Sequence, residues 1–233
     1  MTSAAAHRLV GALERSRRLH AGRAASTTLA GRLDELARFQ SLRLSATYLD
    51  LERLPRYAPA IAFFRADLYG PGDFSRRDAD LARIVPTLVR MLPEAAIATV
   101  ADAMHLSALS QELDRTLLDQ LVGDLSVARY CAAYRACANR REREQQIALI
   151  GAVGRGLDRY VHSRALRNTL VVMRLPARAS GLGALQKFLE RGVSAFARMR
   201  GADEFLDTIQ AREGALMRAI FEGSDTAFAD PRR

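Results

Sequence analysis

The chain has 233 residues, a formal net charge of +9 at pH 7 and 49% hydrophobic residues. This apolar content is enough for a buried core and excludes a disordered tail. Ala, Leu and Arg dominate while Gly and Pro are sparse, which favours helix over most of the length. We therefore expect an all-α fold, a single bundle of about eight to ten helices over residues 1–223, with a frayed polar tail at 224–233.

Targeting and membrane-spanning patterns are not found in the sequence. Charged residues interrupt the N-terminal apolar stretch, unlike the core of a signal peptide. The longest apolar run, IALIGAVG at 147–154, is far shorter than the ~20 residues that cross a bilayer. Cys131 and Cys137 are six apart and face different neighbours on a helix, so we expect buried thiols and no disulfide or metal pair. These patterns predict a cytoplasmic protein without a transmembrane segment.

Apolar spacing and the positions of Pro, Gly and Ser predict the helices in chain order. The expected ranges are 4–20, from 26 or 27 to just before 55, 57–69, 76–91, 93 to a break near 105–107, from that break to 121, 125–139, 139–175, 182–199 and 203–222. Ser107 or Ser110 is the predicted cap after the break. Pro176 and the ARASGLG sequence after it predict a loop.

The stretch FFRADLYGPGDFSRRDADL, residues 63–81, reads as a helix, a turn and a second helix. One apolar face is predicted at helical spacing, comprising Tyr57, Ile61, Phe64 and Leu68. Gly70 and Pro71 form a stop signal, and Ser75 with Asp78 resembles a capping box. Off the apolar face lie four residues that would present any function of this corner: Phe63, Arg65, Asp67 and Tyr69.

The aspartates of the same stretch do not have the spacing of a calcium loop. Asp78 and Asp80 are two residues apart on a predicted helix and point in different directions, so they cannot share one ion. We expect Asp80 to form an ion pair with Arg76 or Arg83 instead.

The run from Phe63 to Asp114 resembles an uncharacterised bacterial family known by its FFLEELY motif. Here the motif reads FFRADLY, so the flanking aromatic residues and Leu68 match while three central positions depart. The resemblance covers about 70 residues strongly, and GLGALQKFLERGVSAFARM near the C-terminus is similar to the family as well. It implies a helical bacterial protein and brings no activity with it.

Two acid and histidine pairs could line a cavity of a helical bundle. Asp102 and His105 are three apart, Asp158 and His162 are four apart, and each spacing brings both groups to one helix face. Di-iron carboxylate bundles use such spacings, but they also need Glu ligands on facing helices. These four residues are candidate metal or haem ligands, although we expect no cofactor.

The GAVGRG sequence at 151–156 has the order G-x-x-G-x-G without a preceding strand or a Gly-Lys-Ser/Thr ending. It satisfies neither nucleotide-binding fingerprint. Its small residues are better explained by the close approach of two helices.

The positive charge is concentrated in residues 129–200, which contain 15 basic and 4 acidic residues. Such a segment suits a phosphate-rich partner, because each neutralised phosphate releases counterions. The candidate anion-binding residues are Arg155, Arg159, His162, Arg167, Arg174 and Arg178. In the alternative interpretation these arginines are solvated and pair with acidic residues of the last helices, namely Asp203, Glu204, Asp207 and Glu213.

Three functional hypotheses follow. The leading one is a non-catalytic protein that associates with itself, most simply as a homodimer, or with another protein. The second is a metal- or small-ligand-binding helical enzyme that uses Asp102, His105, Asp158 and His162. The third is an electrostatic binder of nucleic acid or an anionic surface through residues 129–200, with few aromatic residues available to stack on bases.

Overall fold

A computed structural model describes the backbone of residues 3–68, 74–163, 168, 170–172 and 174–232. Every regular element in these residues is helical, which confirms the all-α prediction. The elements are α1 (Ala4–Ala24), α2 (Thr27–Thr47), α3 (Leu49–Glu52), α4 (Ala58–Phe63), the π-helix η1 (Phe64–Leu68), α5 (Ser75–Met91), α6 (Glu94–Gln120), α7 (Val127–Ala136), α8 (Arg140–Val161), α10 (Arg174–Ala179), α11 (Gly183–Met199) and α12 (Asp203–Phe221).

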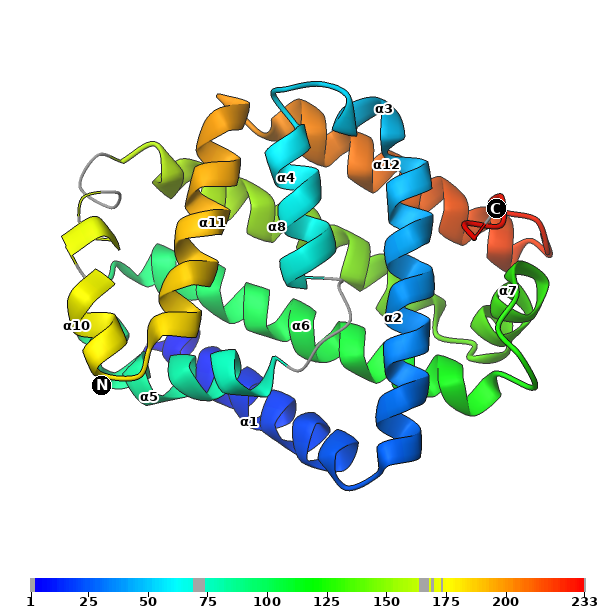
Figure 1. Cartoon of the computed structure of the whole chain (residues 1–233), viewed down its shortest axis with the longest axis horizontal. Helices are drawn as coiled ribbons and strands as arrows, with labels where there is room; N and C mark the ends of the chain where they lie inside the picture. The colour runs from blue at the N-terminus through cyan, green and yellow to red at the C-terminus, as the bar shows by residue number, and fades with distance from the viewer. Residues whose placement is uncertain (1–2, 69–73, 164–167, 169, 173, 233) are drawn as a thin grey trace.

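The long helices form two crossing groups. Helices α1, α6, α8 and α12 pack side by side in that order, and Figure 1 shows them running roughly parallel across the view. Helices α2, α4 and α11 cross over this layer, with α4 between the other two. Contacts of α11 with α8 and of α2 with α6 join the two groups. Because crossing helices touch at only part of their length, this arrangement can leave space between the layers.

Serine side chains fix the start of three helices. Ser3, Ser26 and Ser126 each accept a hydrogen bond from the backbone N–H three residues on, which satisfies a donor that has no partner inside the helix. The predicted start of α2 after Ser26 is confirmed. Pro93 directly precedes α6, close to the first-turn position expected for it.

Three predicted boundaries are wrong. Helix α6 continues through 105–107 without a break, because Ser107 and Ser110 do not cap a new helix but accept hydrogen bonds from Gln111 and Gln146 side chains. Helix α8 ends at Val161, short of the predicted 175. The predicted loop at Pro176 is in part helical, since α10 contains this proline near its start, where a missing N–H costs no hydrogen bond.

The corner at 63–81 folds differently from its predicted capping. Phe74 is the N-cap residue of α5 and makes no side-chain capping bond, so the Ser75 and Asp78 capping box is not formed. Asp78 is instead buried, where it bonds to residues far away in the sequence. Asp80 does pair with Arg83, at 3.7 Å. The predicted stop at 70–71 and the side chain of Leu68 lie outside the described residues.

The glycines of α8 allow neighbouring helices to approach closely, as predicted. A Cβ atom at Gly154 would overlap the Leu206 side chain of α12, and one at Gly156 would lie 2.7 Å from the Thr99 side chain of α6. At Gly151 it would overlap Gln210 of α12. The GAVGRG sequence is therefore a packing device on both sides of α8.

The C-terminal segment contacts the rest of the chain at several points. Phe228 packs against the rings of Phe39 and Tyr130, with centroids 5.9 and 5.7 Å apart. Arg135 of α7 donates to the backbone carbonyl of Ser224 at 3.0 Å. One aromatic side chain in a polar tail thus finds an apolar site that local sequence does not reveal.

Both cysteines are free thiols, with Cys131 buried and Cys137 half-buried. Burial raises the pKa of both thiols. Among the described residues, no helix has the length and apolar character needed to cross a bilayer.

Candidate ligand cavity

A cavity of about 1100 Å³ lies between the crossing helices. Helices α6 and α8 form its floor, with lining side chains from Pro93 to Arg115 on α6 and from Arg143 to Val161 on α8. The lined part of α8 spans 18 steps of the chain, which corresponds to about 27 Å. Most of the wall is apolar. The cavity is therefore hydrophobic, and it extends along most of α8.

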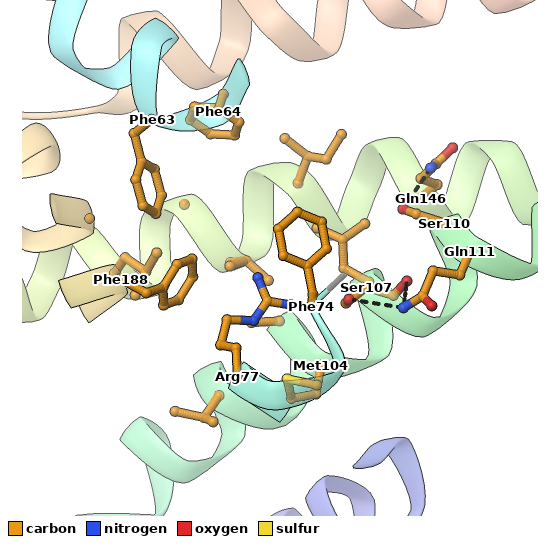
Figure 2. A pocket seen from close by; sticks show the side chains of 18 of the residues that line it. Phe63, Phe64, Phe74, Arg77, Met104, Ser107, Ser110, Gln111, Gln146 and Phe188 are labelled. Atoms are coloured by element: carbon orange, nitrogen blue, oxygen red, sulfur yellow. Dashed lines mark hydrogen bonds between the residues drawn. The ribbon is translucent and has the colours of Figure 1, made fainter. Parts of the chain in front are cut away.

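One end of the cavity is aromatic. Phe63 of α4, Phe64 of η1, Phe74 before α5 and Phe188 of α11 gather there, as Figure 2 shows. The rings of Phe63 and Phe188 lie 5.4 Å apart between centroids. Arg77 lies over the rings of Phe74 and Phe188, at 4.6 and 4.9 Å, and so closes this end with cation–π contacts.

A buried polar cluster lies beside this aromatic end. Asp78 of α5 accepts hydrogen bonds from Ser16 of α1 at 2.5 Å and from Arg77 at 3.0 Å, and its Oδ2 lies 3.0 Å from Nε2 of His20. Burial acts to raise the pKa of Asp78, but the His20, Arg77 and Ser16 contacts outweigh it and lower the pKa. His20 and Arg77 also line the cavity. This cluster fixes α5 against α1.

The opposite end of the cavity is polar. Arg43 of α2 donates to both carboxylate oxygens of Glu213 of α12, at 2.8 and 2.9 Å, and the Tyr48 hydroxyl donates to the same carboxylate at 2.7 Å. Burial acts to lower the pKa of Arg43, but Glu213 more than reverses this, so the pKa is raised. The positive charge of Arg43 is thus balanced by the negative charge of Glu213.

Arg143 of α8 is a second arginine at the polar end, with only 4% of its surface exposed. Its terminal nitrogens make long hydrogen bonds to the Gln146 side chain, at 3.3 Å, and to the Leu113 carbonyl, at 3.4 Å. Its guanidinium carbon lies 4.4 Å from the centre of the Tyr134 ring. Within the described part of the chain, no carboxylate lies within 4 Å of it and its Nε has no hydrogen-bond partner.

Asp114 of α6 lines the same end and accepts a hydrogen bond from Gln40 at 2.9 Å. Burial raises the pKa of Asp114, although the nearby Arg143 charge opposes this shift. Burial also raises the pKa of the Tyr130 and Tyr134 hydroxyls, so both remain protonated at neutral pH. The polar end therefore offers hydrogen-bond donors beside a buried cation.

The four candidate metal ligands do not converge on one point. Asp102 pairs with Arg8 at 2.9 Å, and the two ring nitrogens of His105 lie 3.1 Å from Arg15 and Gln145. Burial and the Arg15 charge lower the pKa of His105. Asp102 and Asp158 do line a common smaller pocket, which is lined mainly by residues of α6 and α8.

His162 is the C-cap residue of α8 and lies 3.4 Å from Asp158. Among the described residues, no group of three or more His, Cys, Asp or Glu side chains is arranged to hold a metal ion. The metal hypothesis therefore gains no support from the geometry.

The basic segment is distributed over several elements. Arg155 pairs with Asp207 of α12 at 3.2 Å and also donates to Gln210, as the alternative interpretation predicted. Arg174 pairs with Glu190 of α11 at 2.6 Å. Arg159 joins Arg155 in the smaller pocket, Arg178 is exposed on α10, and Arg167 lies outside the described residues.

Other predicted acidic partners contact arginines outside this segment. Glu204 pairs with Arg56 at 3.2 Å, and Glu213 pairs with Arg43. Among the candidate anion-binding residues, Arg155 and Arg174 are thus paired with carboxylates in the described part of the chain.

The predicted motif surface is also divided. Phe63 is buried, with 6% exposure, because its ring packs against Phe188 of α11. Arg65 pairs with Glu52 at 2.8 Å and lines the cavity. The side chain of Asp67 and the whole of Tyr69 lie outside the described residues.

A family model described as a domain of unknown function, DUF8198, matches residues 19–227. The chain is a DUF8198 protein. No curated protein and no solved structure matches it. The resemblance to the FFLEELY-motif family stays a prediction, as does an origin in bacteria.

Sequence reasoning missed the polar end of the cavity in this DUF8198 protein. A signal for Arg143 does exist, because it lies seven residues before Ile150 and four before Ile147, on the apolar stripe of α8. An arginine on an apolar stripe is unusual and points to a buried charge. The contacts of Arg43 with Glu213 and of His20 with Asp78 join residues 170 and 58 apart, and no local pattern reveals them.

Proposed function

We propose that this DUF8198 protein binds an elongated, mainly apolar small molecule in the cavity between its crossing helices. The observation that carries the proposal is a cavity of about 1100 Å³ with mostly apolar walls. Ligand sites of proteins are typically concave and apolar, about 300–1,000 Å³ in volume, with a few polar groups that fix orientation. The cavity is slightly larger than this range, and its polar groups are few, with Arg43 and Arg143 at one end and Arg77 and His20 beside the aromatic end.

The volume of the cavity argues against a packing defect. Protein interiors are packed nearly as densely as organic crystals, and voids larger than a water molecule are few. An empty apolar cavity costs free energy in proportion to its volume, because its lining loses dispersion contacts. A ligand that fills the space would restore these contacts.

Native mass spectrometry of protein purified from its own host tests the proposal directly, because a retained apolar ligand adds mass. Displacement of a fluorescent apolar probe, measured on delipidated protein, gives the affinity. Ala103→Phe places a ring in the cavity wall of α6 and should weaken probe binding at least tenfold. Ala148→Phe is the matched control, because Ala148 is exposed on α8 and does not line the cavity.

Equal loss of binding in both variants would indicate a general effect of phenylalanine on the fold. Probe binding that survives Ala103→Phe unchanged would contradict binding in this cavity. Thermal unfolding of both variants checks that each is folded under the conditions of the binding measurement.

A second candidate function is the protein–protein association that the sequence predicts, most simply with a second copy of this chain. A specific observation favours it, because Val171, Val172 and Leu175 are exposed to 56%, 73% and 76%. Clustered exposed apolar side chains are typical of interaction sites. Sedimentation of the protein and of the Val172→Glu, Leu175→Glu double variant over a range of concentrations tests this function. Identical monomer masses for both at all concentrations would contradict self-association through this patch.

A further inference from the structure

The arginines of the cavity indicate which end receives a charged group of the ligand. Among the residues that the structure describes, six arginines line the cavity, and four of them pair with a carboxylate. The four pairs are Arg23 with Asp34, Arg43 with Glu213, Arg65 with Glu52, and Arg77 with Asp78. Arg115 is exposed, so bulk water can solvate its charge. Arg143 is the sixth arginine, and it is buried without a carboxylate within 4 Å among the described residues.

A buried guanidinium without a carboxylate is an unusual arrangement. A charge that leaves water loses several kcal/mol of solvation, and a protein normally compensates this loss with an opposite charge and full hydrogen bonding. Arg143 has only two long hydrogen bonds to neutral acceptors, and its Nε is unpaired within the described residues. A guanidinium has five N–H donors in a planar fork that fits a carboxylate. Much of this donor capacity is unused.

The groups around Arg143 are mainly uncharged hydrogen-bond donors, and the one nearby carboxylate, Asp114, acts on its charge without forming an ion pair within 4 Å. Tyr134 lies under the guanidinium at 4.4 Å and keeps its hydroxyl proton at neutral pH, as Tyr130 does. Asp114 is occupied by Gln40 and does not lie within 4 Å of Arg143. Protonated phenol groups beside a guanidinium donate hydrogen bonds to a bound anion without adding negative charge.

We infer that the ligand is an amphiphile with a single carboxylate headgroup, which binds Arg143, and with a long apolar tail that runs along α8 toward Phe63 and Phe188. This inference rests on the proposed function. One unpaired buried cation suits one negative charge. A phosphate monoester carries nearly two charges and would need a second cation, but Arg43 is already held by Glu213.

The first experiment compares three probes of equal chain length on delipidated wild-type protein at pH 7.5, below their critical micelle concentrations. The probes are hexadecanoate, hexadecanol and hexadecyl phosphate, measured by calorimetry. We expect hexadecanoate to bind at least tenfold more tightly than the other two. Equal affinity for acid and alcohol would overturn the carboxylate inference and leave the proposed function standing. Tighter binding of the phosphate would overturn the choice of a single charge. No binding of any probe would contradict the proposed function itself.

The second experiment replaces the cation. Arg143→Met should remove the preference for the acid over the alcohol and leave hexadecanol binding within twofold of wild type. Arg140→Met is the matched control one turn away, at an exposed arginine that pairs with Glu144, and should keep the preference. A preference that persists in folded Arg143→Met would overturn the assignment of the headgroup to Arg143.

Stability separates a ligand-binding role from a structural one. The free Arg143→Met protein should be about as stable as the free wild type, because the relief from a buried, incompletely hydrogen-bonded charge is offset by the loss of its attraction to Asp114. A variant that is too unstable to test would contradict this expectation. Arg143→Lys then serves as the second variant and should retain a reduced preference for the acid.

Discussion

Glu213 of α12 accepts hydrogen bonds from both terminal nitrogens of Arg43 of α2, at 2.8 and 2.9 Å. The two residues are 170 positions apart in the sequence and belong to different helix layers. Both side chains are largely buried, with 10% and 14% exposure. A bidentate pair of this kind fixes the orientation as well as the distance of the two helices. It thereby holds the crossing helix α2 over the polar end of the cavity.

Loss of the Glu213 carboxylate should destabilise the protein strongly. In Glu213→Gln, the Arg43 charge remains buried without a counter-charge, which typically costs about 3–5 kcal/mol. The free energy of unfolding in urea measures this loss. Asp207→Asn is the control, because it breaks the exposed pair with Arg155 and should cost less than about 1 kcal/mol. Similar losses in both variants would contradict a special role for the buried pair.

The close contact of α8 with α12 predicts a glycine that cannot be replaced. Gly154→Ala places a methyl group against Leu206 in the core, and such overpacking typically costs about 1–3 kcal/mol. Gly11→Ala in α1 is the matched control, because a Cβ there meets no atom within 4 Å. Alanine at Gly11 should stabilise the helix by about 0.5–1 kcal/mol. Thermal unfolding should shift in opposite directions for the two variants.

The sequence predicts much of the local structure of this fold. Ser26 and Pro93 mark helix starts because capping depends on neighbours a few residues away. The glycines of GAVGRG indicate close helix packing, although not the identity of the partner helices. The break predicted at His105 fails because Ser107 finds a partner on its own helix and the surrounding packing stabilises α6 throughout.

The cavity itself could not be predicted in this way. It depends on how helices α2, α4 and α11 cross α6 and α8, and crossing is a property of the whole molecule. Phe63 illustrates the point, since helical spacing places it off the apolar face of its own helix, yet its ring packs against Phe188, far along the chain. Arg143 could be recognised as unusual from its position, but not as unpaired.

Asp78 should make the protein sensitive to acid. Its pKa is lower in the folded state than its ordinary value of 3.8, because the contacts with His20, Arg77 and Ser16 outweigh the effect of burial. As the pH falls, the Asp78 carboxylate is therefore protonated in the unfolded state before it is protonated in the folded state. Its contribution to stability is complete above pH 3.8 and is lost as the pH falls through the pKa of the folded state. The difference in unfolding free energy between wild type and Asp78→Asn should shrink over this range.

Asp114 should affect the pH dependence of stability in the opposite direction to Asp78, and the same unfolding measurements test it. Burial raises its pKa above 3.8, so the folded state binds the proton more tightly than the unfolded state. Ionised Asp114 destabilises the fold at neutral pH, and this penalty is relieved as the pH falls through its folded pKa. Asp114→Asn should therefore gain stability relative to wild type at pH 7, and the gain should disappear in acid. Equal pH dependence of the Asp78 and Asp114 variants would contradict these assignments.

The length of the cavity predicts how affinity depends on the ligand tail. Each CH₂ group buried in an apolar site contributes roughly 0.8 kcal/mol, so the Kd of saturated carboxylic acids should fall roughly fourfold for each added carbon. This gain should stop when the tail reaches the rings of Phe63 and Phe188, because these rings and Arg77 close the far end. Calorimetric titration of a homologous series of acids measures both the slope and the break.

The chain length at which the gain in affinity stops also shows where the apolar tail of the ligand ends in the cavity. Phe188→Ala enlarges the aromatic end and should move the break to longer acids, while the slope for shorter acids stays the same. Lys187→Ala, next to it on α11, is the control, since Lys187 is exposed and does not line the cavity. A Kd that does not change with chain length would show that the tail does not enter the cavity. A break that stays in place in Phe188→Ala would instead place the end of the tail short of the aromatic rings.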